Sequence, residues 1–251
     1  MVVPINPQPL LELKNLKTQF GSKIIHRDLS LSVETGEILV LLGGSGAGKS
    51  VLLRTLIGLE IPSQGSCLFQ GSDLFSLRES EWTKLRIQIA YAFQGGALFD
   101  SLTVGENLAY PMRAHTNWSN SKISEEIAKM LELISLPGTE NLLPSALSGG
   151  MQKRVGLARA IALNPTLILY DEPTAGLDPA NSRKISELML ELKKQGKTSI
   201  LVTHDTECAL HVANRIAFIH GGKIAALQSI AQFKSNPDPL IAAYFSGEDI
   251  S

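Results

Sequence analysis

The pattern of hydrophobic and polar positions divides the chain into alternating strands and helices. From Leu10 to about Glu37, apolar residues alternate with polar ones and turn residues interrupt them, which predicts a small antiparallel sheet. Strands that alternate with helical stretches are typical of an α/β fold with a mostly parallel sheet. Further strands are predicted from short apolar runs at 38–42, 66–71, 87–93, 167–170 and 198–203.

Helical spacing dominates the middle of the chain. Within 121–136, apolar residues fall on one helical face, among them Ile123, Ile127 and Leu131. A second helix is expected near 180–195. We expect a single domain over 1–251, made of a core at 10–94 and 164–230, an inserted helical subdomain at 95–163, and a tail at 231–251.

Composition narrows the function classes. The chain has 251 residues, of which 44% are hydrophobic and 19% charged, as in a globular protein with a sizeable core. Its net charge of −1 gives no sign of nucleic-acid binding. The start of the chain lacks the basic residues of a signal peptide, and no aliphatic run approaches the ~20 residues of a membrane helix. Work at a membrane would need another chain. Cys67 and Cys208 form no CxxC pair and are expected to be reduced.

A glycine-rich segment, GGSGAGKS at 43–50, follows a buried strand and opens a helix. Glycines let backbone N–H groups curl around a phosphate, and the helix N-terminus adds partial positive charge. Lys49 can reach the β- and γ-phosphates, and the Ser50 hydroxyl can bind Mg²⁺. A chance glycine-rich turn would not be expected to combine the strand, the lysine, the serine and the helix.

Two other strand ends carry polar side chains suited to phosphate chemistry. Asp171 and Glu172 end the strand LILY, where Asp171 would bind the Mg²⁺ shell and Glu172 would act as general base on water. Alone, this pair is more simply explained as an acidic N-cap before a helix, and it is the phosphate loop on a neighbouring strand that favours the catalytic interpretation. His204 follows the strand TSILVT and could hydrogen-bond a γ-phosphate or orient the water. The remaining histidines are expected to be surface or core residues: His26, His115, His211 and His220.

A second glycine-rich helix start, LSGGMQKR, begins at Leu147. Ser148, Gly149 and Gly150 offer a hydroxyl and N–H donors, which suit an anion. The segment has no metal ligand and no lysine placed like Lys49, so it could only complete a nucleotide site whose other groups lie elsewhere. A plain serine N-cap is the alternative interpretation.

These motifs, in this order and over nearly the whole chain, resemble the ATP-binding-cassette (ABC) ATPases. The resemblance implies a P-loop, RecA-like core, ATP and Mg²⁺ as cofactors, and a head-to-tail homodimer in which one copy's signature covers the other's ATP. Met151 departs from the usual glutamine of the signature and puts the geometry at the dimer seam in doubt. The family resemblance also implies catalytic roles for Lys49, Gln94, Glu172 and His204, and metal binding by Ser50, Gln94 and Asp171. The nucleotide-binding residues it implies are Phe20 (stacked on adenine), Gly43, Gly44, Ser45, Gly46, Ala47, Gly48, Lys49, Ser50, Val51, Gln94, Ser148, Gly149, Gly150, Asp178 (at the seam) and His204.

A finer resemblance joins QGGALFDSLTVGENLAYPMR, the LSGGM signature, LARAIALNP and the tail NPDPLIAAYF. Together they are similar to the ATPases of Mce/Mla-type phospholipid transporters. This implies an integral-membrane permease, an Mce-domain lipid-binding protein, and a peripheral position on the cytoplasmic face of the inner membrane. An ATPase of another ABC importer or exporter is the alternative. A soluble ABC protein is less favoured because the chain has one cassette and no heptad run, and a non-hydrolysing cassette because Lys49, Glu172 and His204 are present.

The segment YAFQGGALFDSLTV combines chemical and apolar residues. Gln94 would face the nucleotide, and Gly95 and Gly96 would give the backbone freedom. Leu98 and Phe99 either dock a permease helix or pack under the helical subdomain. Both interpretations stay open at the level of sequence.

Overall fold

The computed structural model describes residues 8–248, so the predicted features of the two extreme ends lie outside the described residues. The chain forms two compact units. One contains the residues up to Lys84 together with those from Ala213 onward, and the other is Leu85–Val212. The predicted boundaries of the helical subdomain, 95–163, stay a prediction.

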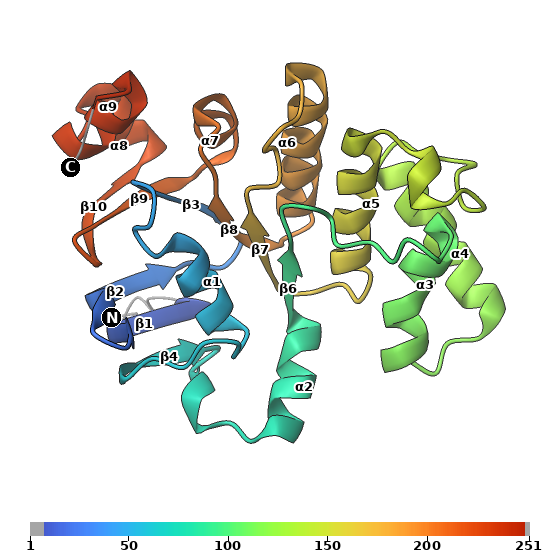
Figure 1. Ribbon diagram of the computed structural model, residues 1–251, viewed down its shortest axis with the longest axis horizontal. Coiled ribbons are helices and arrows are strands. Elements are labelled where there is room, and N and C mark those ends of the chain that lie inside the picture. Colours follow the sequence, from blue (N-terminus) through green and yellow to red (C-terminus); the bar gives the residue numbers. More distant parts are fainter. Residues whose placement is uncertain (1–7, 249–251) are drawn as a thin grey trace, which may run out of the picture. The chain divides into compact units, whose positions relative to one another are not determined.

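The antiparallel sheet predicted for the start of the chain is present in the first unit (Figure 1). Its first two strands form a hairpin, and side chains alternate between buried and exposed along them, which explains the period of two in the sequence. The strand order is β2-β1-β4-β5. The strands are β1 (Leu11–Phe20), β2 (Lys23–Val33), β4 (Gln64–Phe69) and β5 (Ser72–Asp73).

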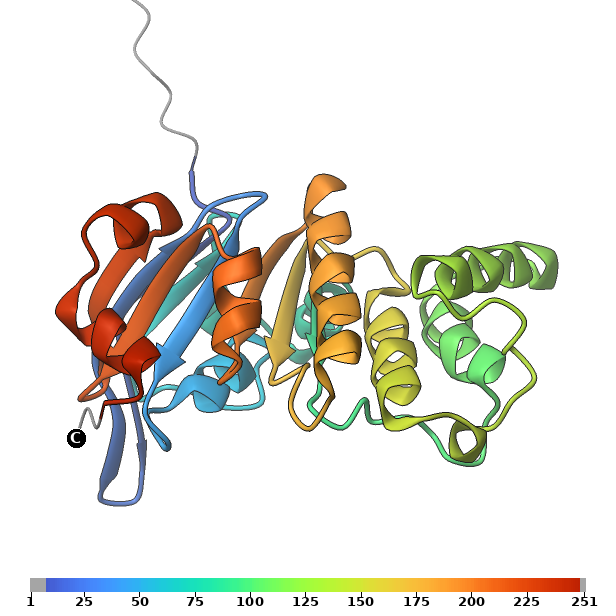
Figure 2. The same cartoon turned by 90° about the horizontal axis from the view of Figure 1, so that it is seen from above.

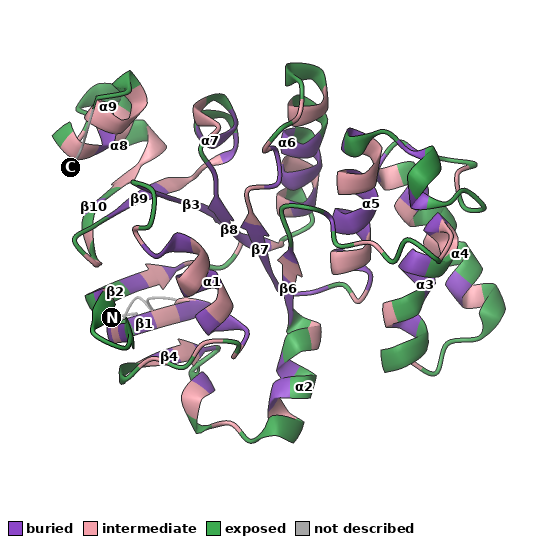
Figure 3. Cartoon of the chain, viewed as in Figure 1, coloured by how far each residue is buried: buried purple, intermediate pink, exposed green. Residues whose placement is uncertain are grey.

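The first unit also contains the strand that leads to the phosphate loop. β3 (Ile38–Gly43) is buried along its whole length, as Figure 3 shows. It pairs in parallel with β9 (Arg215–His220), and β9 forms an antiparallel hairpin with β10 (Lys223–Ser229). In this unit α1 (Lys49–Leu56) and α8 (Ile230–Ser235) follow strands, α9 (Pro239–Ser246) follows α8, and a 3₁₀ turn lies at Leu74–Ser76.

The second unit contains three parallel strands in the order β8-β7-β6. Parallel strands bring their carboxyl ends to one edge, which is where ligands bind in open α/β sheets. Together with the parallel β3/β9 pair and the antiparallel sheet, they confirm the predicted α/β fold class. The elements are β6 (Ile89–Ala92), β7 (Leu167–Asp171), β8 (Thr198–Val202), α6 (Pro179–Lys194) and α7 (Thr206–Val212).

One strand boundary was predicted too early. The strand expected over 87–93 begins at Ile89, because α2 (Glu79–Gln88), in which the chain passes between the units, continues to Gln88. The Gln88 carbonyl accepts a hydrogen bond from the Thr166 amide, which leads the chain into the β6/β7 pair.

Three helices pack against one another in the second unit (Figure 2). Thr103 caps the first of them reciprocally with Glu106, a capping box that fixes where the helix begins. Ala109 and Met112 form a buried cluster with Ile123, as the helical spacing predicts. The helices are α3 (Val104–His115), α4 (Asn120–Leu133) and α5 (Gly149–Ile161), with a 3₁₀ turn at Pro144–Ala146.

Candidate functional site

The phosphate loop lies between β3 and α1 in the first unit. Gly48 occupies the N-cap position of α1 and provides no side-chain cap, and the first turn has no acidic residue. The amides at this helix start are therefore suited to an anion. Lys49 is 7% exposed, and its ammonium donates to the carbonyls of Gly43 (2.7 Å) and Gly44 (3.0 Å). These bonds hold the cation over the loop.

Two glycines of this loop are required by close packing. Gly48 has φ of +97°, and a Cβ there would lie 2.7 Å from Nε2 of His26. A Cβ on Gly43 would lie 2.5 Å from the Ile219 carbonyl oxygen. A larger residue at position 43 would clash with the Ile219 backbone, and one at position 48 with the side chains of Ile25 and His26.

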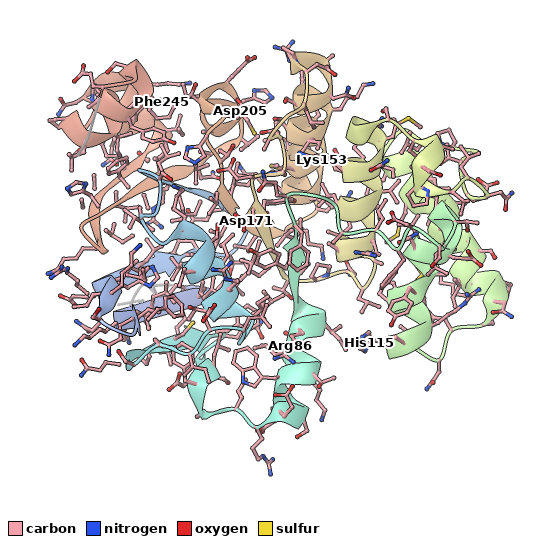
Figure 4. The ribbon with its side chains drawn as sticks, in the orientation of Figure 1. Arg86, His115, Lys153, Asp171, Asp205 and Phe245 are labelled. Atoms are coloured by element: carbon pink, nitrogen blue, oxygen red, sulfur yellow. The ribbon has the colours of Figure 1, made fainter. Side chains whose placement is uncertain are left out.

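In the second unit, the carboxyl ends of β7 and β8 bring Asp171, Glu172 and His204 together. Asp171 is the last residue of β7 and is labelled in Figure 4. The Tyr91 hydroxyl, from β6, donates to its Oδ2 at 2.6 Å. Because a carboxylate held by a hydroxyl loses rotational freedom, Tyr91 fixes the orientation of the predicted metal ligand.

Glu172 and His204 contact each other directly. The His204 amide donates to Glu172 Oε2 at 3.1 Å, and His204 Nε2 lies 3.4 Å from Oε1. Glu172 has φ of +52°, a strained conformation for a non-glycine residue, and its amide donates to the Val202 carbonyl. Strained backbone of this kind is enriched at functional sites.

The Gln94 loop follows β6. Gln94 is exposed, and a Cβ on Gly95 would meet nothing within 4 Å, so the space around Gly95 is open. Gly96 is buried with φ of +72°, and its Cα would lie 2.5 Å from a Cβ on Gly156 of α5. Gly96 is therefore closely packed, and the backbone freedom of Gly95 and Gly96 stays a prediction.

The apolar part of the loop is anchored to the helices of the same unit. Asn107 is fully buried; it accepts from the Phe99 amide and donates to the carbonyls of Phe99 and Leu102. The guanidinium of Arg159, on α5, donates to the Ala97 carbonyl at 2.6 Å and lies 5.0 Å from the Phe99 ring centroid. The backbone of 96–102 is therefore fixed to α3 and α5.

The side chains of this segment are only partly covered. Leu98 is half-buried and Phe99 is 42% exposed. The Phe99 ring packs on that of Tyr110, which is itself 53% exposed, with centroids 4.9 Å apart. Complete burial of Phe99 within the described chain is excluded, and the exposed rings form a small apolar surface.

The signature segment begins α5 as expected. Ser148 is the N-cap and its Oγ accepts from the Met151 amide at 3.3 Å. Gly150 is buried, and a Cβ there would lie 2.7 Å from Cγ of Asn181. Asn181 also donates from its backbone and side-chain nitrogens to Asp178, at 2.9 and 2.6 Å. The backbone bond from Asn181 lowers the pKa of Asp178, which stays ionised.

A further bond joins the signature helix to the segment before Asp178. The ammonium of Lys153, labelled in Figure 4, donates to the Ala175 carbonyl. Signature and 175–178 thus form one connected structure within the chain.

The Ser50 hydroxyl in the first unit and the Asp171 carboxylate in the second are each oxygen donors of the kind that Mg²⁺ takes. Residues 8–248 contain no cluster of three or more His, Cys, Asp or Glu that could bind a metal. Phe20 ends β1 with its ring 46% exposed, as stacking on a base would require.

Four residues of these sites were missed from the sequence. Tyr91, Asn107 and Arg159 act through contacts between residues distant in sequence, which spacing does not reveal. His26 was assigned to the surface or core without a role, and it is buried against the Gly48 carbonyl. For Tyr91 one signal existed, since a tyrosine near the end of a buried strand needs a hydroxyl partner.

Comparison with known proteins agrees with this geometry. The family model described as ABC transporter matches residues 26–175. The chain is 37% identical to a probable ribonucleotide transport ATP-binding protein of Mycobacterium leprae, over 96% of this chain and 70% of that protein. It is 38% identical to the intermembrane phospholipid transport system ATP-binding protein MlaF of Haemophilus influenzae, over 96% of this chain and 92% of that protein.

A solved structure titled as the dimeric, post-hydrolysis state of the ATP-binding cassette MJ0796 bound to ADP and Pi has a TM-score of 0.80 to this chain. The two are 31% identical, over 88% of this chain and 98% of that one. Family model, relatives and solved structure agree with the order of motifs. This chain therefore belongs to the ABC transporter family, as an ATPase subunit.

Proposed function

We propose that this chain binds ATP with Mg²⁺ and hydrolyses it to drive phospholipid movement between membranes, with a separate permease. The observation that carries the substrate class is the similarity to MlaF, which extends over 96% of this chain and 92% of the relative.

In this proposal the phosphate loop binds the β- and γ-phosphates, and Lys49 neutralises their charge. The Phe20 ring stacks on the adenine. Ser50 and Asp171 would hold Mg²⁺, with Gln94 contacting the metal or the attacking water; the metal supplies charge neutralisation at the phosphates. The remaining residues implied at the nucleotide are Gly43, Gly44, Ser45, Gly46, Ala47, Gly48 and Val51.

Glu172 is proposed as the general base. Its carboxylate takes a proton from the water whose oxygen attacks the γ-phosphorus, as the bond from that phosphorus to the β–γ bridging oxygen breaks. The contacts of His204 with both carboxylate oxygens support this role, because they hold Glu172 in one orientation. His204 is proposed to hydrogen-bond the γ-phosphate or orient the water.

We propose a head-to-tail homodimer in which Ser148, Gly149 and Gly150 of one copy close the nucleotide of the other. The relative MJ0796 is titled as dimeric. Within this chain the signature is joined to Asp178 through Asn181, so both would meet the second copy as one rigid surface. Asp178 would then lie at the dimer seam.

The exposed rings of Phe99 and Tyr110, with Leu98 beside Phe99 in sequence, are proposed as part of the permease docking surface. Residues 8–248 contain no helix long and apolar enough to cross a membrane. From the similarity to MlaF we propose a peripheral subunit on the cytoplasmic face of the inner membrane, working with an integral-membrane permease and an Mce-domain lipid-binding protein.

A second substrate class follows from one relative. The Mycobacterium leprae protein is named for ribonucleotide transport, although this chain covers only 70% of it.

The test is to purify the tagged chain from its native membrane with its partners and to measure ATP turnover of the complex. Stimulation by phospholipid vesicles with recovery of a permease supports the proposal. Stimulation by ribonucleotides other than ATP and not by phospholipid, or recovery on ribosomes or DNA without a permease, would overturn it.

A further inference from the structure

A histidine lies directly beneath the phosphate loop. His26, on β2, is fully buried, and its Nε2 lies 3.2 Å from the Gly48 carbonyl oxygen. On the other side of the ring, Nδ1 lies 3.0 Å from the hydroxyl of Thr18, its cross-strand partner on β1. Both ring nitrogens therefore have a defined contact.

The chemistry of the two partners determines which ring nitrogen of His26 carries the hydrogen. A carbonyl oxygen can only accept, so Nε2 must carry the hydrogen and donate it to Gly48. Nδ1 then accepts from the Thr18 hydroxyl. Burial lowers the pKa of His26, so the ring is neutral near pH 7 and carries the single hydrogen that this arrangement needs.

The contact determines the orientation of one peptide plane. The Gly48 carbonyl also accepts from the Leu52 amide at 2.9 Å, the first bond of α1. Because a trans peptide points its C=O and its N–H to opposite sides, fixing the Gly48 oxygen fixes the direction of the Lys49 amide. That amide belongs to the anion-binding start of the helix.

The packing around Gly48 leaves no room for a larger residue at this position. A Cβ on Gly48 would lie 2.6 Å from Cγ2 of Ile25 and 2.7 Å from Nε2 of His26. The ring therefore fills the space that only a glycine leaves open, and its hydrogen bond gives the Gly48 carbonyl a second partner beside the Leu52 amide.

We propose that His26 is a positioning residue for nucleotide binding: its Nε2–H holds the Gly48 peptide so that the Lys49 amide faces the nucleotide's β-phosphate. This inference rests on the ATP-binding function proposed above. His26 lies outside the motifs named above, and its role is to hold the phosphate loop in place rather than to contact the nucleotide.

The test uses the full chain and Mg·ADP, which carries the β-phosphate and is not hydrolysed. In isothermal titration, His26→Leu should weaken ADP binding about three- to tenfold, the effect of one lost hydrogen bond. His26→Gln, whose amide nitrogen can reach the same carbonyl, should stay within about twofold of the unmodified chain. His211→Leu, at an exposed histidine of the other unit, is the matched control and should change nothing.

Turnover separates positioning from general destabilisation. In His26→Leu the KM for ATP should rise while kcat changes less than about twofold. If that variant does not fold, Thr18→Val, which removes the donor to Nδ1, should weaken ADP binding about threefold or more. Equal affinity of all variants, or equal loss in His26→Leu and His26→Gln, would overturn the inference. Absence of binding by the unmodified chain would overturn the proposed function, and the inference with it.

Discussion

The His204 backbone amide and the Glu172 carboxylate are hydrogen-bonded at 3.1 Å, and the His204 ring lies 3.4 Å from the other carboxylate oxygen. Two adjacent parallel strands, β7 and β8, deliver these residues to the same sheet edge. Glu172 also sits in a strained backbone conformation. A side chain held from two directions on a strained backbone is suited to act as a fixed base.

The Tyr91 hydroxyl should tune the metal dependence of the reaction. Tyr91→Phe removes the 2.6 Å bond to Asp171 and lets that carboxylate rotate, so the Mg²⁺ concentration for half-maximal turnover should rise about three- to tenfold. Mn²⁺ binding in the presence of ADP, followed by electron paramagnetic resonance, should weaken in parallel. Tyr110→Phe, at a 53% exposed tyrosine, is the control. Equal Mg²⁺ titrations for both variants would contradict this role.

Asn107 should control the rigidity of the apolar loop. Asn107→Ala leaves the partly buried amide of Phe99 and the carbonyls of Phe99 and Leu102 without this partner, which should lower the free energy of unfolding by about 3 kcal/mol. Hydrogen exchange across 96–103 should accelerate. Asn141→Ala, at an exposed position of the same unit, should leave both quantities unchanged. Unaltered exchange in Asn107→Ala would show that the loop is held by other contacts.

Leu98 should matter for the permease and not for the nucleotide. Leu98→Asp places a charge on the proposed docking surface, so recovery of permease with the tagged chain should fall at least about tenfold while ADP affinity stays within twofold. Leu59→Asp, at a leucine 58% exposed in the first unit, is the matched control. Loss of folding in Leu98→Asp alone would instead assign this side chain to the core.

The buried histidine should make stability depend on pH. Because burial lowers the pKa of His26 below its ordinary 6.5, the unfolded chain binds a proton that the folded chain resists, and stability falls as the pH drops below about 6.5. The melting temperature should therefore fall more between pH 7.5 and 5.5 for the unmodified chain than for His26→Gln, which has no titrating ring. Parallel losses in the two proteins would show that His26 does not contribute.

The sequence was sufficient for the elements whose residues act locally. The phosphate loop, the end of β7 and the start of α5 were predicted because glycines, caps and buried runs determine backbone geometry within a few residues. The early start predicted for β6 has the same origin, since the single apolar residue Ile87 fits both a helical and a strand period.

Contacts between residues distant in sequence could not be predicted from local patterns. Nothing in the sequence around His26 indicates that its ring meets Gly48, and nothing around Arg159 indicates that it meets Ala97. Both contacts depend on how elements pack, and packing against non-neighbouring segments leaves no periodic signal. The close packing of Gly96 against Gly156 is another contact of this kind.

Glu172 is proposed as the base of an ATP-hydrolysing subunit. Steady-state ATP turnover of the unmodified chain and of Glu172→Gln tests this role, with Mg·ADP affinity of both proteins measured alongside. Removal of a general base should lower turnover about a hundredfold or more, with ADP affinity within about twofold. Undiminished turnover in Glu172→Gln would show that another group is the base.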